Sequence, residues 1–206
     1  CRRVLEQILN ISIKKVVSPI TQKTIDLLLD GKGIRLDVYV NDDKGTVYNV
    51  EMQRTRRKDL PKRARYYQGN IDLDLISAGR PYEDLRKTYV IFICTFDFFN
   101  QGRHIYTFEN ICKEDNKLIL GDETVKMFLN TKGRLDDVSG DIKEFLQYIE
   151  TTTAEFAASA NNSLIKDIQK KVDAVKYSKE MEVEYMTLLQ RDRENRELGC
   201  EEGLKI

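Results

Sequence analysis

The sequence contains few residues of the types that build metal clusters and disulfide scaffolds. It has one histidine, His104, and four cysteines that are scattered along the chain and form no CxxC pair (Cys1, Cys94, Cys112 and Cys200). The single histidine excludes a multi-histidine metal centre, and the cysteine spacing argues against a zinc site and a disulfide framework. Scattered cysteines fit a reducing compartment, so we expect a cytoplasmic location.

The chain also lacks a long apolar run and an excess of either charge. No stretch reaches the roughly 18 apolar residues of a membrane-spanning helix, so we expect no membrane association. The formal net charge is +0, so any affinity for nucleic acid must come from local clusters of charge. Hydrophobic residues make up 41% and charged residues 33% of the 206 residues, which suits one core beneath a highly charged surface.

The spacing of apolar residues predicts three helical regions. Asp59 can cap the second region, Pro61 suits its first turn, and Gly79 can end it. The third region ends in a highly charged segment, which we expect to be a helix that is solvated or packed on a partner. Because the chain begins at Cys1 rather than at Met, we expect that an N-terminal piece is missing. The helical regions are residues 2–9, 59–79 and 141–206.

Strands are predicted between these helices. Residues 35–40 and 46–53 alternate apolar and polar side chains on either side of the turn sequence "NDDKG", so they form a hairpin. The run "KTYVIFICTFDFF" is typical of a fully buried strand, and shorter strands are expected within 102–112 and 123–132. The order predicts an α/β fold with a mixed sheet. We expect a core domain at 1–135 and a helical C-terminal extension at 136–206.

Two carboxylates stand inside the predicted hairpin, where strands usually avoid acids. Antiparallel pairing about a centre at residue 44 would place Asp37 and Glu51 opposite each other, and strict alternation puts Leu36 and Tyr39 on different faces. Opposed like charges destabilise a sheet, and a hard cation such as Mg²⁺ would compensate them. Gln53 shares the face of Glu51 and could orient a water molecule. In the alternative interpretation, both acids face solvent and pair with Lys or Arg.

A basic segment follows the hairpin directly. Its cations are suited to a phosphate backbone beside a metal site, and Arg63 and Tyr67 are the best candidates for contacts with phosphate or with the acids. In the alternative interpretation, Tyr67 belongs to the core and the arginines form a solvated face or pair with the acidic tail. The segment holds one acid, Asp59, among seven cations: Arg54, Arg56, Arg57, Lys58, Lys62, Arg63 and Arg65.

The stretches "LDVYV", "YNVEMQ", "KDLPKRARYYQGNID" and "YVIFICTFDFF" together resemble the PD-(D/E)XK nuclease superfamily. More narrowly, they resemble the bacterial family of PD-(D/E)XK nuclease transposases, or recombination-promoting nucleases. The resemblance implies a restriction-endonuclease-like mixed central sheet flanked by helices. It also implies that Asp37 and Glu51 bind Mg²⁺, or Mn²⁺, with the Met52 backbone carbonyl as a further ligand. Gln53 takes the third motif position, which is often lysine, and glutamine supplies only hydrogen bonds there.

The resemblance implies a metal-dependent DNA endonuclease that acts in DNA recombination or transposition. Asp37, Glu51 and Gln53 would form the catalytic set. Two alternatives stay open: a non-catalytic nucleic-acid-binding protein that keeps the nuclease fold, and a module that oligomerises through its C-terminal helices. The expected DNA contacts are Arg54, Arg56, Arg57, Lys62, Arg63 and Tyr67.

Overall fold

The computed structural model describes residues 1–17, 19–25 and 34–176. The predicted charged segment after residue 176 lies outside these described residues. Contacts group the chain into two compact units, residues 1–151 and residues 152–206. In the second unit the described helices are α4 (Ala154–Ser159) and α5 (Ser163–Lys176). In the first unit they are α1 (Arg2–Leu9), α2 (Leu60–Leu75), the short helix η1 (Tyr82–Asp84) and α3 (Gly140–Glu150).

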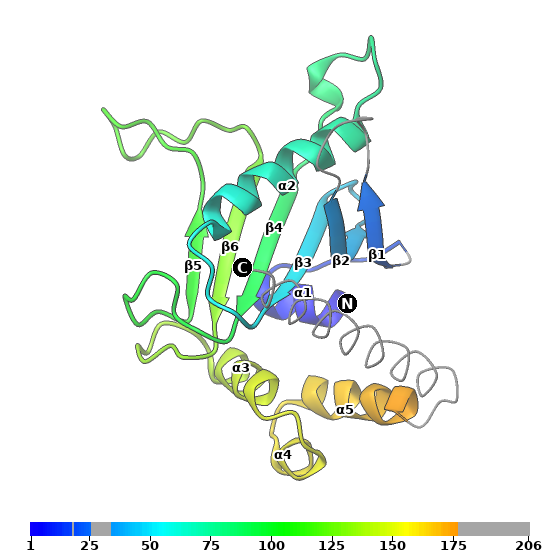
Figure 1. The fold of residues 1–206 in the computed structure, drawn as a ribbon, viewed down its shortest axis with the longest axis vertical. Coiled ribbons are helices and arrows are strands. Elements are labelled where there is room, and N and C mark those ends of the chain that lie inside the picture. Colours follow the sequence, from blue (N-terminus) through cyan, green and yellow to red (C-terminus); the bar gives the residue numbers. More distant parts are fainter. Residues whose placement is uncertain (18, 26–33, 177–206) are drawn as a thin grey trace, which may run out of the picture. The chain divides into compact units, whose positions relative to one another are not determined.

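The first unit is built on one mixed sheet (Figure 1). Its strands lie in the order β1-β2-β3-β4-β6-β5, and β3, β4 and β6 run parallel while the other pairs are antiparallel. The predicted α/β fold with a mixed sheet and flanking helices is therefore confirmed. The strands are β1 (Ile20–Ile25), β2 (Ile34–Asn41), β3 (Val47–Gln53), β4 (Thr88–Cys94), β5 (Ile105–Phe108) and β6 (Thr124–Asn130).

The β2–β3 hairpin has the register that its sequence predicts. Val38 pairs with Val50, and the pairing continues to Asn41 and Val47, so its centre lies at residue 44. The turn is closed by Asp42, whose carboxylate accepts hydrogen bonds from backbone N–H groups within it. A polar turn that bonds its own backbone fixes the register of the strands that it joins.

The alternation of β2 does not hold across Asp37, which corrects the prediction. Leu36 and Tyr39 belong to one buried cluster, although strict alternation would separate them. Lys23, the partner of Leu36 in the sheet, places its Nζ 3.9 Å from the centre of the Tyr39 ring. Asp37 takes no part in either ladder of β2, and Gln22 beside it on β1 has a left-handed backbone with φ of 56°. The irregular backbone at this point lets the chain change faces.

Helix α2 connects the parallel strands β3 and β4 and lies over one face of the sheet (Figure 1). Pro61 stands in its first turn as predicted, and Tyr67 and Ile71 are buried against the sheet. The helix ends at Leu75, because Ile76 takes an extended backbone. Gly79, with φ of +83°, lies in a turn beyond the helix, so the prediction that it ends α2 is wrong.

The opposite face of the sheet is covered by α1 and the start of α3. Ile8 and Ile142 line a cavity of about 550 Å³ together with Tyr89 and Val125, which alternate with the residues that face α2. Strand β4 is thus covered on both faces, which explains its continuous apolar sequence. The two acids of the hairpin lie on β2 and on β3, and β3 pairs directly with this central strand.

Candidate active site

Asp37 and Glu51 meet where the β2–β3 ladder stops. Glu51 Oε1 accepts a hydrogen bond of 3.0 Å from the Asp37 backbone N–H, and Asp37 Oδ2 accepts one of 3.1 Å from the Met52 backbone N–H. Each carboxylate therefore binds the backbone of the other strand, in the place of regular ladder bonds. Glu51 is 1% exposed, whereas Asp37 is exposed to solvent. The structure brings together the two acids that the pairing arithmetic predicted as neighbours.

The environment of Glu51 favours its neutral form. Burial raises the pKa of Glu51 to about 7, and the nearby Asp37 carboxylate also raises it. The Asp37 backbone N–H and the Arg63 guanidinium act in the opposite direction, because both stabilise the ionised carboxylate. A group that is buried beside a like charge would ionise more readily if a cation bound next to it.

Gln53 is buried at 7% exposure, and both ends of its amide are engaged. Its Nε2 donates a hydrogen bond of 2.6 Å to the Thr55 carbonyl. Its Oε1 accepts one of 2.9 Å from Arg63 Nη1. The amide therefore has a fixed orientation at the end of β3, and the residue that fixes its oxygen comes from α2.

Arg63 joins three members of the site. Besides Gln53, it binds Glu51 Oε2 through Nη2 at 3.3 Å and the Tyr67 hydroxyl through Nε at 2.7 Å. Tyr67 is 7% exposed, and its ring stacks on Phe92 of β4 with 6.2 Å between ring centres. Burial raises the pKa of Tyr67. The interpretation of Tyr67 as a core residue is confirmed for its ring, and its hydroxyl is the acceptor for Arg63.

The donor set of the site suits a hard divalent cation. Within the described residues, no group of three or more His, Cys, Asp or Glu side chains could hold a metal. Asp37 and Glu51 thus offer two carboxylates, and Mg²⁺ commonly takes one or two carboxylates together with waters and substrate phosphate. The residues present fit such an ion. The Met52 carbonyl stays a prediction as a third ligand, although its N–H is bound to Asp37.

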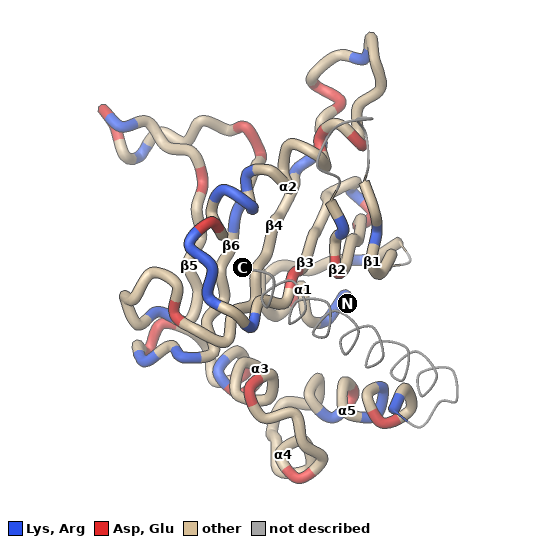
Figure 2. Tube along the Cα trace, viewed as in Figure 1, with Lys and Arg blue, Asp and Glu red and all other residues tan. Residues whose placement is uncertain are grey.

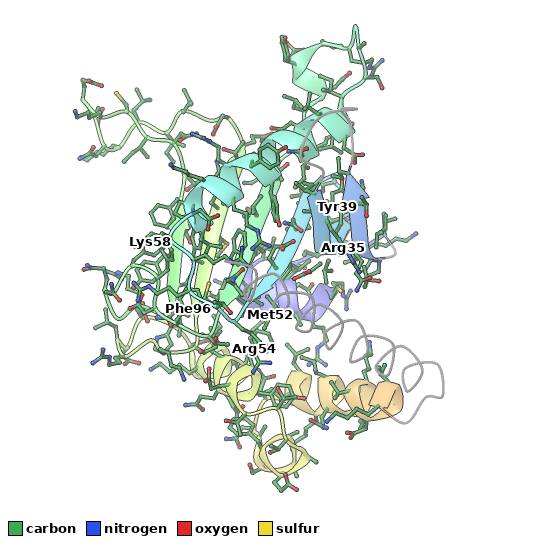
Figure 3. All side chains as sticks on the ribbon, viewed as in Figure 1. Arg35, Tyr39, Met52, Arg54, Lys58 and Phe96 are labelled. Carbon is green, nitrogen blue, oxygen red and sulfur yellow. The ribbon has the colours of Figure 1, made fainter. Side chains whose placement is uncertain are left out.

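A basic groove adjoins the acid site. A cavity of about 790 Å³ is lined by Gln53, by Asp59 as its one acid, and by five cations. Figure 2 shows the Lys and Arg residues along the segment from β3 into α2, and Figure 3 labels Met52, Arg54 and Lys58 on this stretch. The cations that line the groove are Arg35, Arg57, Lys62, Arg63 and Arg65.

Some predicted residues lie elsewhere, and others were missed. Arg54 does not line the groove, and Arg56 donates to the Phe98 carbonyl at 3.0 Å. Arg35 was not predicted as a site residue, although its place two residues before Asp37 on one strand was a signal. Asn49 was also missed: it is fully buried two residues before Glu51, and neither polar atom of its amide has a hydrogen-bond partner within the described residues.

The fold is that of a restriction-endonuclease-like α/β protein. It combines a mixed sheet and flanking helices with two carboxylates at the end of a hairpin and a basic helix after it. The family model of the PD-(D/E)XK nuclease family transposases matches residues 3–198, and the chain belongs to this family. Membership supports a role connected with nuclease activity or transposition. No curated protein and no solved structure matches the chain. Among the described residues, no helix is both long and apolar enough to cross a membrane.

Proposed function

We propose that the protein is a cytoplasmic, metal-dependent DNA endonuclease that hydrolyses phosphodiester bonds during DNA recombination or transposition. The observation that supports it best is the reciprocal arrangement of Asp37 and Glu51, each bound to the backbone of the other strand. A sheet that only needed charge balance would give each acid its own Lys or Arg partner. Here Glu51 pairs with Arg63, whereas the exposed Asp37 has no ion pair within the described residues, and a basic groove lies beside them.

Asp37 and Glu51 would hold Mg²⁺ or Mn²⁺, with the Met52 carbonyl as a further ligand. The bound ion would polarise the phosphodiester and lower the pKa of a water molecule. The chain's own contribution is geometric, because the strand backbone and Arg63 hold the carboxylates in place. Gln53 completes the catalytic set through its fixed amide, which bears no charge of its own.

The basic groove would bind the DNA backbone beside the acids. Arg57 and Lys62 line the groove, and Arg54 and Arg56 precede it in the same segment. Contacts of this kind hold a strand without reading its sequence. They weaken as salt concentration rises, because the counterions that binding releases from DNA then gain less entropy. We therefore expect DNA affinity to fall steeply with salt, independently of metal.

The test is cleavage of supercoiled plasmid by the purified protein in Mg²⁺, Mn²⁺ or EDTA. Nicked or linear DNA should appear with either metal, and neither Asp37→Asn nor EDTA should support cutting. Asp43→Asn is the matched control, because Asp43 is an exposed acid of the same hairpin that binds the Lys15 backbone N–H. Binding without cleavage in both metals would contradict the proposal and favour a non-catalytic DNA-binding protein. Equal cutting by Asp37→Asn and wild type would exclude this site.

A further inference from the structure

The segment that follows the hairpin contains two kinds of cation, and Arg63 differs from the others. We propose that Arg63 is a positioning residue of the acid site rather than a contact for DNA phosphate: it supplies the positive charge that Gln53 lacks and holds Glu51 and Gln53 in place. This inference rests on the proposed nuclease function. It changes the role of one residue that the sequence placed among the DNA contacts.

The guanidinium of Arg63 already binds side chains of the protein. Each of its three nitrogen atoms donates to a different side chain: Nη1 to Gln53, Nη2 to Glu51 and Nε to Tyr67. Its side chain is 30% exposed, so it reaches the groove only in part. A phosphate bound by Arg63 would have to compete with these contacts. The planar fork of arginine suits such multiple recognition better than lysine does.

Two aromatic rings pack against the guanidinium of Arg63. Its central carbon lies 5.0 Å from the Tyr67 ring centre and 5.6 Å from the Phe92 ring centre, which is within cation–π range. Tyr67 and Phe92 are themselves buried and stacked on each other. A flexible phosphate-binding arm needs no such support, whereas a residue that sets the position of other groups does.

The neighbouring cations have the opposite character. Arg57, Lys62 and Arg65 are exposed and line the same groove. For their side chains the structure shows no hydrogen bond or ion pair within the described residues. They are available to phosphate, so the groove can bind DNA without Arg63.

Charge balance explains why one cation must face the acids. When both are ionised, Asp37 and Glu51 bring two negative charges to one point, and Gln53 beside them is neutral. In the described part of the chain, the ion pair of Glu51 is made by Arg63. Removing one partner of a buried pair leaves an uncompensated charge, which is strongly destabilising. Arg63 therefore acts on the acids even before metal or DNA binds.

The contact between Gln53 and Arg63 offers a direct test, because the positive charge can be moved from position 63 to position 53 by substitution. The two side chains meet at 2.9 Å, so a lysine amine at position 53 would lie close to the place of the guanidinium. We would compare Arg63→Met, Lys62→Met and the double variant Gln53→Lys/Arg63→Met. Lys62→Met is the matched control, since Lys62 is the preceding residue of the same helix and lines the same groove.

Three measurements separate the roles. Cleavage kinetics give kcat and KM, fluorescence anisotropy in EDTA gives DNA affinity, and calorimetry in EDTA gives the melting temperature. Arg63→Met should lower kcat by about 10–100-fold, the range for residues that orient metal ligands. It should also lower the melting temperature by several degrees and change DNA affinity less than Lys62→Met does. Lys62→Met should weaken DNA binding and its salt dependence and raise KM, with the melting temperature unchanged. The double variant should recover kcat and melting temperature in part.

Two outcomes would overturn the inference. If Arg63→Met weakens DNA binding as Lys62→Met does and leaves kcat unchanged, Arg63 is a phosphate contact. If the double variant is no better than Arg63→Met in either kcat or melting temperature, the position of the charge does not matter. The melting temperature also separates this inference from the proposed function. If the wild type cuts no DNA, the endonuclease proposal fails, while a loss of stability in Arg63→Met that Gln53→Lys restores still supports the role of Arg63.

Discussion

Two buried acids of one hairpin, Asp42 and Glu51, are 7% and 1% exposed and have opposite surroundings. Asp42 accepts hydrogen bonds of 2.9 Å from the N–H groups of Lys44 and Thr46 and from the Tyr48 hydroxyl. Glu51 has fewer donors and a second acid beside it, and its pKa is raised to about 7. The comparison teaches that burial alone does not mark a functional acid. The hydrogen-bond partners distinguish the two acids, because the turn around Asp42 supplies donors to its carboxylate, whereas Glu51 has fewer donors.

The largest expected effect separates the two acids by activity. Glu51→Gln should lower Mg²⁺-dependent DNA cleavage by more than about 100-fold. Loss of a residue that only orients a metal ligand costs about 10–100-fold, and Glu51 is a proposed ligand itself. The fold should persist, since glutamine keeps the shape of glutamate and can still accept from the Asp37 N–H. Plasmid cleavage rates and circular dichroism test both statements. Retention of more than a tenth of the activity would contradict the assignment of Glu51.

The second effect is on stability and belongs to Asp42. Asp42→Ala should lower the free energy of unfolding by about 3 kcal/mol, because it leaves two backbone N–H groups and the Tyr48 hydroxyl without their charged acceptor. Urea unfolding measures the loss. Cleavage per folded molecule should not change, and a selective loss of activity would show that the turn also serves the site.

The third effect is a pH dependence that Glu51 should show in EDTA. Below its unfolded pKa of 4.5 the carboxyl is neutral in both states, and above its folded pKa of about 7 the folded protein must hold a buried charge. The wild type should therefore lose stability relative to Glu51→Gln as pH rises through this range, by at most about 3 kcal/mol. Urea unfolding at several pH values measures the difference. A difference that stays constant between pH 4 and pH 8 would contradict the raised pKa.

The smallest effects compare two buried tyrosines. Tyr48 donates to Asp42, and Tyr67 accepts from Arg63. Each change to Phe removes one hydrogen bond to a charged group and should lower the free energy of unfolding by roughly 1–2 kcal/mol. Tyr67→Phe should also reduce kcat, by about 10-fold, because Arg63 loses its support. Equal cleavage by the two variants would show that the Tyr67 hydroxyl does not serve the acids.

Local sequence features predicted much of this fold. The turn between β2 and β3 bonds its own backbone, so its residues alone determined the register that brings Asp37 toward Glu51. The continuous apolar run of β4 likewise predicted that this strand is buried on both faces. The end of α2 was missed, because Gly79 has the chemistry of a helix cap but the chain leaves the helix earlier, at Ile76.

The details of the candidate site depend on contacts that a sequence pattern does not contain. The irregular backbone at Asp37 involves Gln22, a residue of another strand with a left-handed backbone. The bonds of Arg63 to Glu51 and Gln53 depend on the rotation of α2 about its axis, which the tertiary packing of Tyr67 determines. Helical spacing nominated Arg63 and Tyr67 for the site, but it did not distinguish an acid partner from a phosphate contact.

The stacking of Tyr67 on Phe92 has a consequence for the order of folding. The contacts that bring Asp37 and Glu51 together lie within one hairpin, so they are local in sequence. The Tyr67 ring beside Arg63 stacks on Phe92. Phe92 takes this position when β4 pairs with β3 across the α2 crossover. Contacts across such a crossover form more slowly than a hairpin does. The acids would therefore assemble before their cation, and catalytic competence would appear only when the central parallel strands are complete.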